Sequence, residues 1–197
     1  IPLRLVGSEM CIRDRLSFIL TFCISPSWAE VTPTLNSDAI KATFGSYGVT
    51  ILNQTESTRV ANLYSGHSGR EICRTLAVTE FVLPMDPKLS LEHEKIRAGG
   101  SIGATLRDAG FSINKKLLIK TKIVAGPAFS QLSNQTVEPG APLATRVYAL
   151  FAQSSERTIP YAIIAEAYHP AHQPPTHEEV SDAPAPVSYT HLRAHET

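Results

Sequence analysis

Two charged residues interrupt segments that otherwise read as buried β-strands. Arg59 begins the apolar stretch RVANL, and Glu166 lies among apolar residues in YAIIAEAY. A buried charge is costly unless an opposite charge or a ligand compensates it. One interpretation is a structural ion pair or an exposed face of the sheet. The other is a ligand pocket in which Arg59 binds a carboxylate and Glu166 meets a hydroxyl or a departing oxygen.

A glycine-rich segment, AGGSIGATLRDAG at residues 98–110, has some features of a dinucleotide-binding loop. It follows a predicted helix instead of a strand, and it lacks the acidic residue that the nucleotide fingerprint places about 20 positions later. The segment therefore favours a corner between two helices that ends in capping glycines. Ligand contact through the backbone amides of residues 101–103 stays open as an alternative, because helix N-termini present free N–H groups.

Histidines gather near the end of the chain in YHPAHQPPTH, which contains His169, His172 and His177. Prolines interrupt their spacing and no cysteine accompanies them, so the pattern does not favour a structural metal site. The isolated His67 and His93 are predicted to be exposed or in turns. We predict no metal and no organic cofactor.

The first half of the chain alternates between helical and extended patterns. Asn36, Ser37 and Asp38 provide capping oxygens before a predicted helix at 38–47, which Gly45 or Gly48 ends. Runs rich in Val, Ile, Leu and Thr predict three strands, and apolar residues at helical spacing then predict two helices. The strands are expected at 49–54, 58–65 and 71–81, and the helices at 89–100 and 102–110.

The second half contains a long strand at 111–125, a polar loop at 126–142 and a closing hairpin of strands at 145–153 and 161–168. The expected order is one helix, three strands, two helices and three strands. Because the connections between strands are short, the sheet should be mainly antiparallel. The sequence thus predicts an α+β fold with about six strands and a few short helices.

The two ends of the chain read as translated adapter DNA. Residues 4–15 can be encoded by a DNA whose complementary strand, in frame, encodes residues 186–197 exactly. That DNA is similar to a transposase adapter used to prepare sequencing libraries. We therefore interpret residues 1–15 and 186–197 as adapter-derived and exclude them from the fold.

A short apolar run, LSFILTFCISPSWA at residues 16–29, ends in a small-x-small pattern that suits signal peptidase. It is shorter than the roughly 20 apolar residues that cross a bilayer. We interpret it as a secretory signal, which predicts an exported, periplasmic or secreted protein with no membrane span after cleavage. An N-terminal core helix and a lipoprotein signal centred on Cys23 are the alternatives.

Composition limits the partners. The 197 residues carry 18 Lys plus Arg and 18 Asp plus Glu, a formal net charge of zero, which gives no electrostatic footprint for nucleic acid.

Between the adapter-derived ends and beyond the signal, Cys73 is the single cysteine, so no intramolecular disulfide is expected there. Residues 173–185 are Pro-rich and acidic and predict a disordered tail. Residues 36–172 remain as one domain.

Several short motifs follow one another in a set order between residues 38 and 170. They are Asp38-Ala39-Ile40 with Phe44, Thr58-Arg59 to Leu63, Ile72-Cys73-Arg74-Thr75, Gly100-Ser101-Ile102-Gly103 with Leu106, Arg146 with Phe151, Pro160, Glu166, and Tyr168-His169-Pro170. This ordered set resembles chorismate pyruvate-lyase and the wider chorismate-lyase-like fold, which also includes effector-binding domains of transcription regulators.

The resemblance implies specific roles. Arg59 would bind a ligand carboxylate, Glu166 would meet a ring hydroxyl, the backbone at Ile102 would assist and Ile40 would line the pocket. It also implies a small, aromatic ligand and the elimination of pyruvate from chorismate or a related enolpyruvyl ether, with Arg59 and Glu166 as the catalytic pair. The alternative is a non-catalytic ligand- or partner-binding module of the same fold.

Overall fold

The computed structural model describes residues 35–173, which lie within one compact unit, residues 32–197. The predicted signal at 16–29 and the two ends predicted to be adapter-derived, 1–15 and 186–197, lie outside the described residues. The predicted tail at 173–185 also lies outside them, except for Gln173. In the part of the chain that the structure describes, no helix is long and apolar enough to span a membrane.

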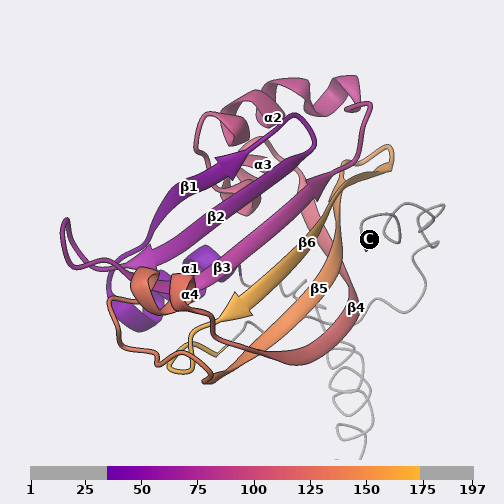
Figure 1. Ribbon diagram of the computed structural model, residues 1–197. Helices are drawn as coiled ribbons and strands as arrows, with labels where there is room; N and C mark the ends of the chain where they lie inside the picture. Colours follow the sequence, from indigo (N-terminus) through magenta and orange to yellow (C-terminus); the bar gives the residue numbers. More distant parts are fainter. Residues whose placement is uncertain (1–34, 174–197) are drawn as a thin grey trace, which may run out of the picture. The chain divides into compact units, whose positions relative to one another are not determined.

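A single antiparallel sheet of six strands organises the domain (Figure 1). Its strands are β1 (Gly48–Gln54), β2 (Thr58–Ser65), β3 (Ile72–Phe81), β4 (Ser112–Val124), β5 (Pro142–Gln153) and β6 (Thr158–Tyr168). Their spatial order is β1-β2-β3-β6-β5-β4, and every neighbouring pair is antiparallel. The last strand of the chain therefore lies at the centre, between β3 and β5. The predicted α+β class is confirmed.

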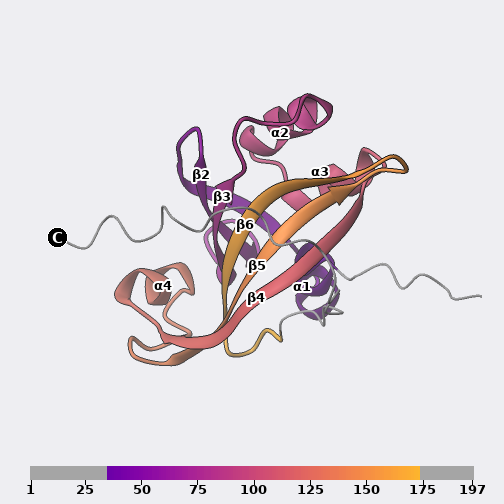
Figure 2. The same ribbon diagram turned by 90° about the vertical axis from the view of Figure 1, so that its right-hand side faces the viewer.

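Three helices cover one face of the sheet, while a fourth lies on the other face (Figure 2). The first three are α1 (Asn36–Phe44), α2 (Ser90–Arg97) and α3 (Ile102–Asp108), and a 3₁₀ turn, Pro87–Leu89, precedes α2. The fourth is α4 (Pro127–Leu132), within the connection from β4 to β5. Side chains alternate along a strand, so each face of the sheet has its own apolar cluster.

The larger cluster joins α2 and α3 to the sheet through Leu89, Ile96, Leu106, Tyr161 and Ile164. The smaller cluster lies beneath α4 and contains Cys73, Phe129, Val137, Leu143 and Ala167. On β6, Ile164 belongs to the first cluster and Ala167 to the second, as the two-residue period of a strand requires. Burial raises the pKa of the Cys73 thiol to about 12, so this side chain packs as an apolar group.

Several element boundaries differ from the sequence prediction. The first helix begins at Asn36, not Asp38, and ends at Gly45, whose φ of 78° is the left-handed conformation that glycine tolerates at a helix end. The predicted loop at 126–142 contains α4, which starts with Pro127 at a position where a missing N–H costs nothing. Strands β5 and β6 each begin three residues earlier than predicted.

Candidate functional site

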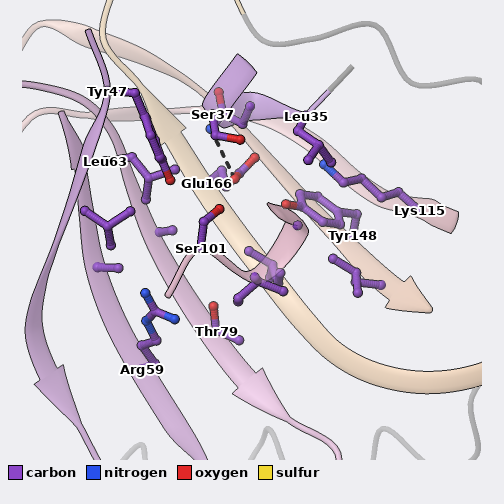
Figure 3. A pocket seen from close by; sticks show the side chains of 18 residues that line it. Leu35, Ser37, Tyr47, Arg59, Leu63, Thr79, Ser101, Lys115, Tyr148 and Glu166 are labelled. Carbon is purple, nitrogen blue, oxygen red and sulfur yellow. Dashed lines mark hydrogen bonds between the residues drawn. The ribbon is translucent and has the colours of Figure 1, made fainter. Parts of the chain in front are cut away.

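A cavity opens on the helix-covered face of the sheet (Figure 3). Its volume is about 60 Å³, several times what one water molecule requires. All six strands contribute side chains to its lining, and β1 contributes Val49. The polar lining residues are Asn36, Ser37, Tyr47, Arg59, Thr79, Ser101, Lys115, Tyr148 and Glu166.

Arg59 lies on β2 and is buried, with 2% of its surface exposed. Its Nη1 donates hydrogen bonds to the carbonyl oxygens of Ile96, at 3.0 Å, and Gly100, at 2.9 Å. Its Nε has no hydrogen-bond partner, and no carboxylate among the described residues lies within 4 Å of the guanidinium. Burial lowers the pKa of Arg59, yet arginine stays charged in proteins. A cation therefore borders the cavity without a balancing anion.

Glu166 lies on the central strand β6 and is 4% exposed. Its Oε1 accepts a hydrogen bond from Asn36 Nδ2 at 3.3 Å, and its Oε2 accepts one from the Tyr168 hydroxyl at 2.5 Å. Tyr148 is a further hydrogen-bond partner of the carboxyl group. Donors on both oxygens suit an ionised carboxylate, which can accept one more hydrogen bond from a ligand hydroxyl.

Asn36 connects Glu166 to the end of the domain. Its Nδ2 also donates to Thr75 Oγ1 at 3.1 Å, and its Oδ1 lies 2.8 Å from His172 Nε2. An amide oxygen only accepts, so His172 carries its proton on Nε2. Burial lowers the pKa of His172, which keeps the ring neutral near pH 7. The sequence TLNSDAI positions Asn36 in the first turn of α1, where the helix meets β3 and β6.

Lys115 reaches the same cavity from β4 and is 9% exposed. Its Nζ lies 4.8 Å from the centroid of the Tyr148 ring, a cation–π distance. Burial lowers the pKa of Lys115, while the nearby Glu166 raises it and Arg146 lowers it. Burial also raises the pKa of Tyr148 well above its usual value, and the Glu166 charge adds to this, so the hydroxyl stays protonated.

The corner between α2 and α3 closes the cavity above Arg59. Ser101 and Ile102 line it there, and Figure 3 shows Ser101 between Arg59 and Glu166 in this view. Ser101 is also a hydrogen-bond partner of Tyr47, whose pKa is raised chiefly by burial. A Cβ at Gly100 would lie 2.9 Å from the Lys95 carbonyl oxygen, so glycine is required where the chain turns to present the Gly100 carbonyl to Arg59.

The structure brings together three of the four residues predicted for the site: Arg59, Glu166 and Ile102 line one cavity. Arg59 and Glu166 are both buried, and no ion pair joins them among the described residues. Ile40 does not line the cavity; it is fully buried, because α1 meets the cavity at its first turn, one helical turn before Ile40.

The histidines also differ in part from expectation. His67 is exposed, as predicted, but His93 is buried on α2, with Nδ1 3.1 Å from the Tyr161 hydroxyl and its ring edge-on to Phe81. The helical pattern around His93 was the available signal for its burial. His169 and His172 lie near each other, while His177 lies outside the described residues. Residues 35–173 contain no group of three possible metal ligands.

Sequence reasoning missed Asn36 and Lys115 as site residues. Asn36 was predicted to cap the helix, but its side chain makes no capping bond and turns toward Glu166. Lys115 follows Ile113 by two residues on β4, which puts both side chains on the same face of the sheet, and Ile113 is buried. This alternation indicates that Lys115 faces inward. The adjacent Lys116 made the signal hard to recognise, because two consecutive lysines point to opposite faces of the sheet.

No protein-family model matches this sequence, and no curated protein matches it. Among solved structures, the chain is similar to a domain described as ligand-binding in a GntR-family transcriptional regulator from Bordetella bronchiseptica. That pair shares 17% identity at a TM-score of 0.42, over 64% of this chain and 87% of the other. A GntR-family transcriptional regulator from Enterococcus faecalis V583 shares 12% identity at a TM-score of 0.40, over 66% and 93%.

A third similar structure is the PhnF C-terminal domain, with 12% identity and a TM-score of 0.39 over 71% of this chain and 77% of that chain. Identities this low do not indicate what the present chain binds.

Proposed function

We propose that the domain, which by its motifs is chorismate-lyase-like, binds a small aromatic carboxylate in the cavity between Arg59 and Glu166. The ligand carboxylate accepts hydrogen bonds from Arg59, and a ring hydroxyl donates to Glu166. One observation carries the proposal: a buried guanidinium and a buried carboxylate border one cavity and do not pair with each other. A ligand with one acid and one hydroxyl group supplies the anion that Arg59 lacks and one further hydrogen bond to Glu166.

Binding, and not pyruvate elimination, is the function that the geometry favours. The lyase reaction implied by the motif resemblance needs a proton delivered to the departing fragment. Glu166 accepts hydrogen bonds on both oxygens, which suits a fixed acceptor and not a proton donor. Pyruvate elimination is therefore tested separately from binding.

Isothermal titration calorimetry with 4-hydroxybenzoate tests the proposal. We expect binding to the wild-type chain and a loss of about 30- to 150-fold in affinity for Arg59→Met, because a charge-assisted hydrogen bond contributes about 2–3 kcal/mol. Arg70→Met is the matched control, since Arg70 is exposed in the turn between β2 and β3, and its affinity should equal that of the wild type.

Equal affinity in Arg59→Met and the wild type would remove Arg59 from the site. No heat with 4-hydroxybenzoate, benzoate or chorismate would instead favour the partner-binding module. Incubation with chorismate followed by a pyruvate assay covers the enzymatic alternative, and pyruvate release that Glu166→Gln abolishes would restore the catalytic interpretation.

We also propose that residues 16–29 direct export and are removed. The apolar run and the Ser27-Trp28-Ala29 ending support this. Mass spectrometry of the native protein should find an N-terminus at Glu30. A retained 16–29 segment would contradict export.

A further inference from the structure

We propose that Lys115 forms a reversible imine with ligands that carry an aldehyde or ketone at the end of the cavity opposite Arg59. The proposal rests on the proposed function, because it assigns a second reactive group to the same ligand. It makes the cavity a site for aromatic carbonyl acids as well as for simple carboxylates.

The geometry around Lys115 supports a nucleophilic amine. The side chain is buried, yet it lines the cavity, so a ligand can reach it. No ion pair joins its Nζ to a carboxylate of the described residues, and the Nζ lies against the face of the Tyr148 ring. A lysine amine that is desolvated, and that has another cation nearby, is more often neutral and so more nucleophilic.

The surroundings of Lys115 identify the charges that act on it. Glu166 on β6 is the nearby carboxylate and Arg146 on β5 the nearby cation, and Arg146 is opposite Glu166 in the strand register. Glu166 stabilises a positive charge on the Lys115 nitrogen, in the ammonium as in a protonated imine, and Arg146 disfavours it. Burial has the largest influence: it lowers the pKa of Lys115 and favours the free amine.

The step itself needs no co-reactant. The neutral Lys115 amine adds to the carbonyl carbon, forming a C–N bond while the C=O bond becomes a C–OH bond. The two amine hydrogens then leave with that oxygen as water, and the C=N bond forms.

The positions of the two cations define the ligand. Arg59 is on β2 and Lys115 on β4, with β3, β6 and β5 between these strands. Four strand spacings of about 4.8 Å put the two backbones roughly 19 Å apart along the sheet, and the long side chains reach inward from both sides. The ligand therefore carries its acid group and its carbonyl at opposite ends, as in a para-substituted benzene ring.

Reductive trapping tests the proposal. The full chain is incubated with 4-formylbenzoate and sodium cyanoborohydride, which reduces an imine to a stable secondary amine, and labelled lysines are found by peptide mass spectrometry. We expect Lys115 to carry about tenfold or more label than any other lysine, because a desolvated amine is more often neutral and lies beside the bound aldehyde. Lys115→Arg should lose this label, whereas Lys120→Arg, a change at an exposed lysine of the same strand, should keep it.

The mapping of the wild-type chain decides the proposal even if a variant folds poorly. Label spread evenly over the lysines, or concentrated on exposed ones, overturns the imine. If 4-hydroxybenzoate still binds in an Arg59-dependent way, the carboxylate site stands without the imine.

Comparing benzaldehyde with 4-formylbenzoate tests the role of Arg59 separately from the imine at Lys115. Benzaldehyde lacks the carboxylate, so it should label Lys115 about tenfold less than 4-formylbenzoate does, and Arg59→Met should remove that difference. Equal labelling by both aldehydes would keep the Lys115 imine and contradict the role of Arg59.

Discussion

The two ends of the cavity contrast in how their buried charges are satisfied. At one end, the Arg59 guanidinium donates to two main-chain carbonyl oxygens, and its Nε has no partner among residues 35–173. At the other end, Glu166 receives hydrogen bonds on both carboxylate oxygens. The first end lacks an anion, whereas the second is held in place before any ligand arrives. The difference indicates that Arg59 provides affinity for an acid group. Glu166, which is already held in position, provides selectivity for ligands that carry a hydroxyl group.

The largest effect is expected at the satisfied end, where Asn36 holds Glu166. Asn36→Ala removes hydrogen bonds to Thr75, Glu166 and His172 and leaves buried polar atoms without partners. We expect the free energy of unfolding to fall by about 3 kcal/mol. Urea denaturation measures it, with Asn53→Ala on exposed β1 as the control, for which a change below about 0.5 kcal/mol is expected. Equal changes in the free energy of unfolding for the two variants would mean that Asn36 does not hold Glu166 in position.

The next prediction separates the role of Glu166 from that of Arg59. Glu166→Gln keeps the shape of the side chain but replaces a charged acceptor by a neutral amide. The preference for 4-hydroxybenzoate over benzoate should fall by about tenfold, or ~1.4 kcal/mol, while benzoate itself keeps its affinity for Arg59. Calorimetry of both ligands measures the ratio, and Glu80→Gln, at an exposed glutamate of β3, is the control. An unchanged ratio would separate Glu166 from the ligand hydroxyl.

A further prediction concerns the pH dependence of stability and the histidine next to the satisfied end. Burial, with the Arg74 and His172 charges, lowers the pKa of His169 to about 4. Below pH 6.5 the unfolded chain protonates this histidine first, so the free energy of unfolding should decrease as the pH falls from about 6.5 toward 4. Denaturation at a series of pH values should show a shallower decrease for His169→Gln. Parallel curves would contradict the burial of a neutral ring.

Much of the fold follows from local patterns. Alternating apolar residues predict all six strands, and the glycines at 99, 100 and 110 predict the corner and end of the second and third helices. The short α4 was missed because six residues give too little periodicity for a helix, and Pro127 with Phe129 was the remaining signal.

The site was predictable where a charge breaks an apolar pattern, as at Arg59 and Glu166. It was not predictable where a residue's role depends on packing between distant segments. Asn36 and His172 are 136 positions apart in sequence and meet only after α1 docks on β6. Lys115 and Lys116 alternate in a strand, and only the tertiary structure shows which one faces the helices.

The most direct measurement is the crystal structure of the domain with 4-hydroxybenzoate. The account predicts the ligand in the cavity, with its carboxylate within hydrogen-bond distance of the Arg59 guanidinium and its hydroxyl on a Glu166 oxygen. A ligand bound elsewhere, or one whose carboxylate points away from Arg59, would contradict it.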